Sequence, residues 1–337
     1  MLKGIGKITC SPAGLHAVVM SSLYYFFFDM LLKFVAKINI MKTFLLFFSS
    51  LGFSFSMYAQ DYDKLKALPG SGVKTYFSAG HEQRAKQIAT RIENVMGFYK
   101  ELIGFRPSVT LLLLSKDDWS SYTKMPVYGM PHYKGDSTLI VAAEDNDFWR
   151  SLLSVKDLPG DVRKQAVKVY GSPDGTVSMQ AFFDLLAIHE LGHAFHNQGK
   201  LQVQRKWMGE LFCNILLHTY IAEKEPGLLP ALTLFPKIIV NGGTKNYKYT
   251  SLQELEEHYN ELGQQHPQNY GWYQCRWHAA AATIYDTDGK IAFQKLWTAL
   301  RSEQNKLDDA ELAKLLKTKV SRSVADVLVG WEKDMVK

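Results

Sequence analysis

The chain has 337 residues, of which 47% are hydrophobic and 21% charged, a composition that excludes disordered and collagen-like classes and allows a sizeable core. Its formal net charge is +6, but five of the 39 basic and one of the 33 acidic residues fall in the first 60 positions, so the remainder carries 34 basic and 32 acidic residues. This balance gives no reason to expect a nucleic-acid partner.

The segment 41–59 has the layout of a secretory signal peptide. A lysine follows its first methionine, an apolar run continues to Phe55, and Ala59 is a small residue suited to cleavage before Gln60. We therefore expect cleavage at the Ala59/Gln60 junction and export of the protein to the periplasm or the extracellular space.

Residues 1–40 admit two interpretations. Positions 13–32 form a nearly continuous apolar stretch that is interrupted by His16 and Asp29. Either Met41 is the true start and residues 1–40 are an over-long start, or the stretch 13–32 anchors the protein in a membrane. Both interpretations place the body of the protein beyond a membrane and confine membrane contact to the leader.

The sequence pattern in the first part of the body predicts a small sheet with a helix packed on it. Short alternating or apolar runs predict three strands: residues 73–77, 108–114 and 137–143. Apolar residues at helical spacing predict a helix over 81–103, with Gly104 as its stop. Glycine and proline mark the segment 125–136 as a loop.

After residue 144 the pattern becomes helical. A charged segment over 144–174 is interpreted as an insertion, and the following apolar spacing predicts helices over 178–197, 205–223, 252–263, 270–285 and beyond 290. Five residues predict an irregular connection between two of these helices: Pro226, Pro230, Pro236, Gly242 and Gly243. The fold class expected is α+β, with a sheet-containing part over 61–200 and a mainly helical part over 201–337.

The cysteines do not organise the protein. Cys10, Cys213 and Cys275 cannot make a disulfide framework, and none belongs to a C-x-x-C pair. Beyond the leader a single bridge from Cys213 to Cys275 is possible, and two buried free thiols are the favoured alternative.

The motif H-E-x-x-H, from His189 to His193, lies within the helix predicted over 178–197, with Ser178 as its N-cap. Positions i and i+4 share one helix face, so both imidazoles can bind one zinc ion. Glu190 can then act as a general base on a water beside the ion. The alternative is structural, with two helix-face histidines and a solvated glutamate.

A catalytic zinc needs a third protein ligand and one open position. Glu210, on the next predicted helix, is the candidate, although a surface helix acid is the simpler alternative. Asn214, one turn later, could hydrogen-bond a ligand histidine. The metzincin spacing fails, because it requires Gly and His where this chain has His196 and Gly199. We interpret His196 as a lip or surface residue.

The motif together with Glu210 resembles the gluzincin metallopeptidases, which include thermolysin and the one-zinc aminopeptidases, over roughly residues 73–300. The resemblance implies a zincin-like fold with an active-site helix and a mainly helical carboxy-terminal half. It implies one Zn²⁺ per chain on His189, His193 and Glu210, and peptide hydrolysis with Glu190 as general base.

The resemblance also implies a tyrosine that hydrogen-bonds the oxyanion, and the match falls on Tyr273, with Tyr270 and His278 in reserve. It matches the strand 137–143 to an edge strand that pairs with an extended substrate. The sequence departs from the family pattern at two points. Asn214 is neutral where thermolysin-like enzymes have an acid, and the sequence lacks the G-x-M-E-N stretch that would support aminopeptidase specificity.

The sequence thus predicts an exported zinc-dependent peptidase with peptide or protein substrates. Two alternatives remain at this point. One is a catalytically inactive zincin-fold module that serves binding or assembly in the cell envelope. The other is a membrane-anchored structural protein with an accidental motif and no metal.

Overall fold

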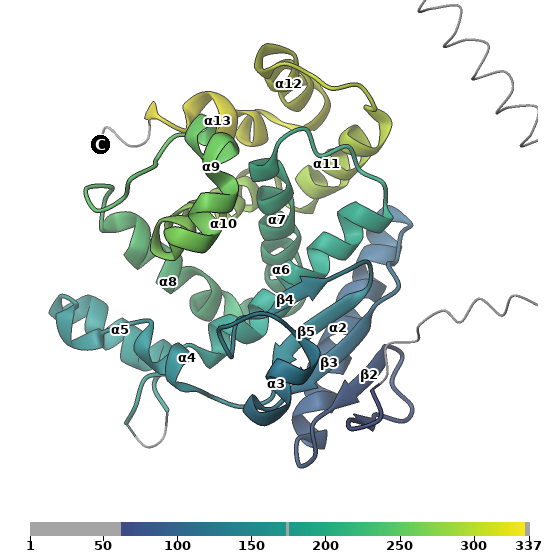
Figure 1. Ribbon diagram of the computed structural model, residues 1–337. Coiled ribbons are helices and arrows are strands. Elements are labelled where there is room, and N and C mark those ends of the chain that lie inside the picture. Colours follow the sequence, from purple (N-terminus) through teal and green to yellow (C-terminus); the bar gives the residue numbers. More distant parts are fainter. Residues whose placement is uncertain (1–61, 173–174, 334–337) are drawn as a thin grey trace, which may run out of the picture. The chain divides into compact units, whose positions relative to one another are not determined.

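The computed structural model describes residues 62–172 and 175–333, which are shown in Figure 1. Over these ranges the fold is mixed α+β and mostly helical, with twelve α-helices and one five-stranded sheet. The predicted signal peptide 41–59, its cleavage junction and the apolar stretch 13–32 lie outside the described residues. Across the described ranges, each helix is too short or too polar to cross a membrane.

The sheet is mixed and has the strand order β1-β2-β3-β5-β4. Its strands are β1 (Lys66–Ala67), β2 (Lys74–Phe77), β3 (Thr110–Leu114), β4 (His132–Lys134) and β5 (Thr138–Ala142). Strands β2, β3 and β5 run parallel, whereas β1 and β4 pair antiparallel at the two edges. The apolar runs of β3 and β5 are buried in the middle of the sheet, as parallel strands require. The three predicted strands are confirmed.

The strand β4 corrects the expectation that residues 137–143 form the edge of the sheet. In the described part of the chain β5 lies between β3 and β4, with Tyr133 opposite Leu139 in the antiparallel register. The sequence pattern did not reveal β4, because its three half-buried residues lie inside a segment that glycine and proline mark as a loop.

The helix α2 (Glu82–Ile103) packs one face against the sheet and against the later helices. Its buried side chains recur at helical spacing and include Ile88, Ile92 and Tyr99. Gly104 ends the helix in the left-handed region at φ 68°, and its N–H donates to the carbonyl of Lys100. A side chain at this position would be strained, so the predicted glycine stop is confirmed.

The described part of the charged segment, residues 144–172, is largely helical and is anchored to the body of the fold. The helix α3 (Lys116–Tyr122) precedes it, and the segment contains α4 (Asp147–Ser151) and α5 (Gly160–Tyr170). The indole N–H of Trp149 donates to the carbonyl of Gly129 at 2.8 Å, and the hydroxyl of Tyr170 donates to the carbonyl of Ala231 at 2.8 Å. These buried hydrogen bonds attach both ends of the segment to other elements.

From residue 180 onward the described chain is helical, as predicted. It comprises α6 (Gln180–Gln198), α7 (Lys206–Lys224), α8 (Leu229–Asn241), α9 (Leu252–Gln265), α10 (Pro267–Asp288), α11 (Lys290–Ser302), α12 (Asp309–Leu315) and α13 (Arg322–Gly330). The helix α7 lies among α6, α9, α10 and α11 (Figure 1), and its side chains from Trp207 to Ile221 are all buried.

Two local predictions in this part are wrong. The connection expected to be irregular is largely the helix α8, because Pro230 occupies the first turn and the buried Leu232 and Phe235 stabilise a helix that contains Pro236. Ser178 is not the N-cap of α6, which begins after Met179, although its Oγ accepts a hydrogen bond from the N–H of Gln180 at 3.2 Å.

The cysteine thiols are not joined in the described part of the chain. Cys213 on α7 and Cys275 on α10 are both buried and free. The favoured alternative of two buried thiols is therefore confirmed.

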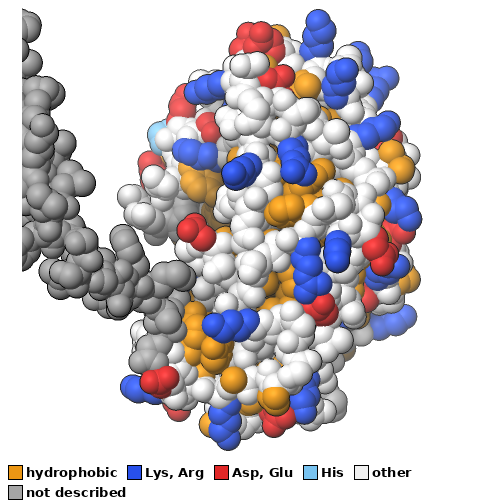
Figure 2. All heavy atoms as spheres, turned by 90° about the vertical axis from the view of Figure 1, so that its right-hand side faces the viewer, with side chains coloured by type: hydrophobic (Ala, Val, Ile, Leu, Met, Phe, Trp, Pro, Cys, Tyr) orange, Lys and Arg blue, Asp and Glu red, His pale blue; other side chains and the backbone are white. Residues whose placement is uncertain are grey.

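The surface carries no concentration of one chemical type on the face that Figure 2 shows, where basic, acidic and apolar side chains are interspersed. Among the described residues, four large apolar side chains are exposed, and they lie far apart in the sequence: Val127, Val167, Ile291 and Val329.

Candidate metal centre

The helices α6 and α7 approach each other closely at Gly192. An ideal Cβ on this residue would lie 2.9 Å from Sγ and 3.0 Å from Cα of Cys213, closer than packed atoms tolerate. Glycine therefore allows the contact between the helices. The close contact directs His189 and His193 of α6 toward Glu210 of α7.

The three predicted zinc ligands come together. Nε2 of His189 lies 3.2 Å and Nε2 of His193 lies 3.9 Å from the same atom, Oε2 of Glu210. Zinc bonds to nitrogen and oxygen are about 2 Å long, so two ligand atoms of a tetrahedral ion lie roughly 3.3 Å apart. His189 and Glu210 are only 4% and 5% exposed. Both histidine nitrogens thus lie near one buried carboxylate oxygen, in an enclosed place.

The predicted general base lies beside this group. Oε2 of Glu190 is 4.0 Å from Nε2 of His193. The same carboxylate oxygen accepts a hydrogen bond of 3.1 Å from the backbone N–H of Tyr133. The edge strand β4 thus orients Glu190, which the sequence alone did not indicate.

The charges within the group stabilise its ionised forms. Burial alone would raise the pKa of Glu210, but the hydrogen bond with His189 and the charge of His193 outweigh burial and lower it. Burial acts to lower the pKa of His189, yet the hydrogen bond with Glu210 and the charge of Glu190 raise it. A carboxylate that stays ionised in the interior is suited to bind a cation.

Both carboxylate oxygens of Glu210 are held by neighbouring helices. The hydroxyl of Tyr259 on α9 donates to Oε1 at 2.7 Å, and Nε2 of Gln274 on α10 donates to Oε2 at 2.7 Å. Gln274 is itself fixed, because its Oε1 accepts from Asn214 at 3.2 Å and its Nε2 also donates to the hydroxyl of Tyr270 at 2.9 Å. Neither Tyr259 nor Gln274 was predicted from the sequence.

Asn214 lies near His189, one of the two histidines to which the sequence predicted that it could hydrogen-bond. Its amide nitrogen donates to the carbonyl of Glu210 at 3.0 Å, and the residue contributes to raising the pKa of His189. Within the described residues, Nδ1 of His189 and Oδ1 of Asn214 are buried without a hydrogen-bond partner. A histidine that binds a metal through Nε2 carries a proton on Nδ1. In that state Nδ1 of His189 is a donor and Oδ1 of Asn214 is an acceptor, so the two atoms are complementary.

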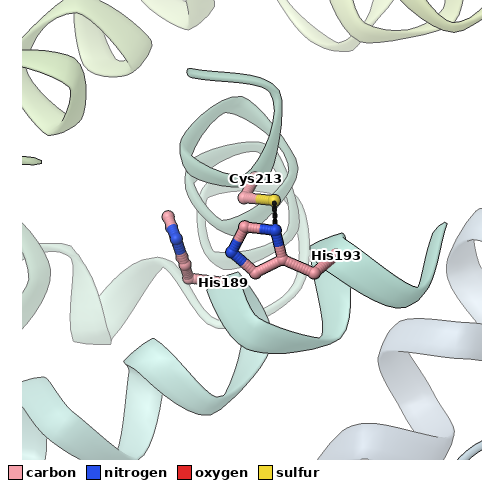
Figure 3. A group of neighbouring side chains, drawn as sticks. All are labelled: His189, His193 and Cys213. Atoms are coloured by element: carbon pink, nitrogen blue, oxygen red, sulfur yellow. Dashed lines mark hydrogen bonds between the residues drawn. The ribbon is translucent and has the colours of Figure 1, made fainter. Parts of the chain in front are cut away.

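A second potential ligand set includes Cys213. Figure 3 shows the thiol beside the ring of His193, with Sγ 3.6 Å from Nδ1. The ligand atoms of His189, His193 and Cys213 all lie within 4.8 Å of one another. Burial, then the charges of Glu210 and Glu190, raise the pKa of the thiol, whereas metals bind the thiolate. The two sets use opposite nitrogens of His193, since Nε2 faces Glu210.

His196 is not a surface residue, and that prediction is wrong. It is 9% exposed, and its Nε2 lies 3.0 Å from Nδ1 of His193. Burial, then the charge of His193, lowers the pKa of His196 to about 4. The signal available in the sequence was the i+3 spacing from His193, which puts both rings on one helix face that α7 covers.

The structure corrects the expectation for Tyr273. Its hydroxyl donates to the carbonyl of Ser251 at 2.7 Å, and its ring stacks on Trp331 with centroids 6.0 Å apart. The reason is helical phase, because the next residue, Gln274, is the one that faces Glu210, and consecutive helical residues point about 100° apart. Tyr273 therefore belongs to an aromatic cluster outside the candidate site.

The two reserve candidates share the helix face of Gln274. Tyr270 lies one turn before it and accepts its hydrogen bond, and His278 lies one turn after it. The ring of His278 is 6.4 Å from that of His189 between centroids. The face of α10 that points toward Glu210 thus begins one position away from Tyr273 and includes both reserve candidates.

The comparisons with known proteins add no family assignment. No family model, curated protein or solved structure matches this chain. The function is therefore inferred from the residues of the site itself.

Proposed function

We propose that this protein is a zinc-dependent peptidase. One observation carries the proposal: Nε2 of His189 and Nε2 of His193, both on α6, lie within 3.9 Å of Oε2 of Glu210 on α7. Glu190 lies beside them and is oriented by the edge strand. An accidental sequence motif would not be expected to gather these four side chains in one enclosed place.

The residues fit zinc in their chemistry. Two imidazoles and one carboxylate are a common set for catalytic zinc, which keeps a fourth position open for water or substrate. Nδ1 of His189 and Oδ1 of Asn214, which have no hydrogen-bond partner, also fit zinc. A histidine that binds zinc through Nε2 carries a proton on Nδ1, and this N–H is a suitable donor for an amide oxygen. When bound, zinc lowers the pKa of a water and polarises a carbonyl.

Each protein group then has a defined task. Glu190 accepts the proton of the attacking water and delivers it to the leaving amine. The N–H of Tyr133 holds one oxygen of Glu190 during both transfers. Tyr259 and Gln274 hold Glu210 in place by one hydrogen bond to each of its oxygens. Substrate orientation is assigned to β4, since an edge strand can pair with an extended peptide.

Glu210 is favoured over Cys213 as the third ligand. Nε2 of His193 faces both Glu210, at 3.9 Å, and Glu190, at 4.0 Å. Binding through this nitrogen keeps the general base next to the metal, whereas Cys213 contacts the opposite nitrogen of the ring. The set with Glu210 therefore supports hydrolysis.

We also propose that the protein is exported, which is supported by the layout of segment 41–59. If the signal peptide is cleaved at the predicted junction, the mature chain begins at Gln60. Mass spectrometry of the secreted or periplasmic protein tests this directly, and a mature chain that retains residues 13–32 would favour the membrane-anchored alternative.

The activity is tested by incubating the protein with a mixed peptide library and following new amino termini by mass spectrometry. Parent protein is expected to cleave peptides, and Glu190→Gln is expected to lose cleavage by at least about a hundredfold while its zinc content stays unchanged. Equal cleavage by both proteins, or loss of zinc from the variant, would contradict the role of Glu190. Zinc binding without any cleavage would favour the binding or assembly module.

A further inference from the structure

We propose that His196 is a positioning residue that fixes the ring of His193 for metal binding. It does so by accepting a hydrogen bond from Nδ1 of His193. This inference rests on the proposed function, because His193 is a ligand of the same centre. His196 itself is not assigned as a ligand.

The geometry between the two rings carries the inference. Nδ1 of His193 and Nε2 of His196 are 3.0 Å apart, and the ring planes are at 77° with centroids 5.2 Å apart. A hydrogen bond between two neutral imidazoles needs one N–H donor and one bare nitrogen acceptor. With the proton on Nδ1 of His193, the lone pair of Nε2 remains available.

That free lone pair faces the other members of the site. Nε2 of His193 is the atom that approaches Glu210 at 3.9 Å and Glu190 at 4.0 Å. The opposite tautomer would place a proton on Nε2 and block metal binding through it. When His196 accepts at Nε2, it therefore favours the tautomer of His193 that a zinc ligand needs.

The packing around His196 holds its ring in this position. The ring meets Phe212 of α7 edge-on, with centroids 6.0 Å apart and planes at 88°. Gly209 of α7 lies close, since a Cβ added there would be 3.9 Å from Nε2 of His196. The ring is thus enclosed between α6 and α7 on the side of His193 away from Glu210.

Cys213 provides a matched control, because it is the other neighbour of the same nitrogen. Its Sγ lies 3.6 Å from Nδ1 of His193, and sulfur is a weak acceptor. Removing the thiol should therefore change the metal site much less than removing the imidazole of His196.

The first experiment measures zinc affinity by chelator competition on the full chain and its variants. His196→Ala is expected to weaken zinc binding by about 10- to 100-fold. His196→Gln, whose side-chain oxygen can accept near the original Nε2 position, should restore most of that loss, and Cys213→Ala should change the affinity less than about threefold. Unchanged affinity in His196→Ala, or an equal loss in Cys213→Ala, would overturn the inference.

A second measurement reports the tautomer and does not depend on metal. Long-range nitrogen-15 NMR of the zinc-free parent should show the proton of neutral His193 on Nδ1, and His196→Ala should shift the ring toward a mixture of tautomers. A proton on Nε2 of His193 in the parent would overturn the inference, even where His196→Ala fails to fold. A parent that binds no zinc would instead overturn the proposed function.

Discussion

Nε2 of Gln274 donates a hydrogen bond of 2.7 Å to Oε2 of Glu210, joining α10 to α7 across 64 positions of sequence. The same oxygen faces both histidines of the motif. Tyr259 of α9 holds the other oxygen. The candidate centre is thus assembled from four helices, and its carboxylate is oriented before any ion binds, which favours binding because less ordering is required.

The two hydrogen bonds that hold the carboxylate of Glu210 can be removed one at a time. Gln274→Ala is expected to weaken zinc binding by about tenfold and Tyr259→Phe by a smaller factor, because each leaves one oxygen of Glu210 free to reorient. Isothermal titration of the zinc-free proteins measures both. Tyr273→Phe is the matched control, since it removes the hydrogen bond to Ser251 instead.

The control has its own expected outcome. Tyr273→Phe should lower the free energy of unfolding by about 1 kcal/mol, because the half-buried carbonyl of Ser251 loses one of its two donors, and should leave zinc affinity and cleavage unchanged. A loss of cleavage with normal zinc binding in this variant would return Tyr273 to the oxyanion role.

The identity of the third ligand separates the two possible ligand sets. Glu210→Gln should abolish stoichiometric zinc binding, because a neutral amide replaces the carboxylate, whereas Cys213→Ala should retain about one zinc per chain. Elemental analysis of both variants decides between them. The reverse pattern would assign the metal to His189, His193 and Cys213.

The close helix contact at Gly192 predicts a stability effect. Gly192→Ala is expected to lower the free energy of unfolding by about 1–3 kcal/mol, because the added Cβ overlaps Cys213 and forces α6 away from α7. Gly97→Ala is the control within α2, where an added Cβ meets nothing within 4 Å. It should raise stability by about 0.5–1 kcal/mol. Urea unfolding measures both, and a neutral Gly192→Ala would contradict the contact.

A pH effect is expected at Glu223, away from the metal centre. The hydrogen bond from Lys290 lowers the pKa of Glu223 against the effect of burial, and Tyr285 adds to the lowering. A carboxyl with a lowered folded-state pKa stabilises the protein above its unfolded pKa of about 4.3, and this contribution is lost as the pH falls through the folded value.

The pair of Glu223 and Lys290 is partly exposed, so its contribution at pH 7 should be below about 1 kcal/mol. The difference in unfolding free energy between the parent and Glu223→Gln should therefore shrink on going from about pH 7 to about pH 3. Urea unfolding at both pH values measures it. A difference that grows toward acid would contradict the sign of this account.

The sequence was sufficient where local spacing decides the outcome. The motif residues His189 and His193 share a face because helical geometry requires it, and α2 ends where Gly104 permits a left-handed residue. The strands β3 and β5 were readable because buried parallel strands are continuous apolar runs. Such features depend on residues a few positions apart.

The sequence was insufficient where distant elements decide. Gln274 and Tyr259 reach Glu210 only because α9 and α10 pack beside α7. The residue spacing within α10 does not show which face of the helix points toward Glu210, so the prediction fell on Tyr273, one position away from that face. His196 is buried because α7 covers it. Tertiary packing, which single-sequence periodicity does not encode, fixed each of these residues.

The zinc content of the purified protein tests the central claim most directly. Elemental analysis of the parent should find about one zinc per chain, and His193→Ala, which removes one ligand, should find close to none. The proposed centre would be contradicted by a parent that holds no zinc even after zinc is added, or by a His193→Ala variant that retains it.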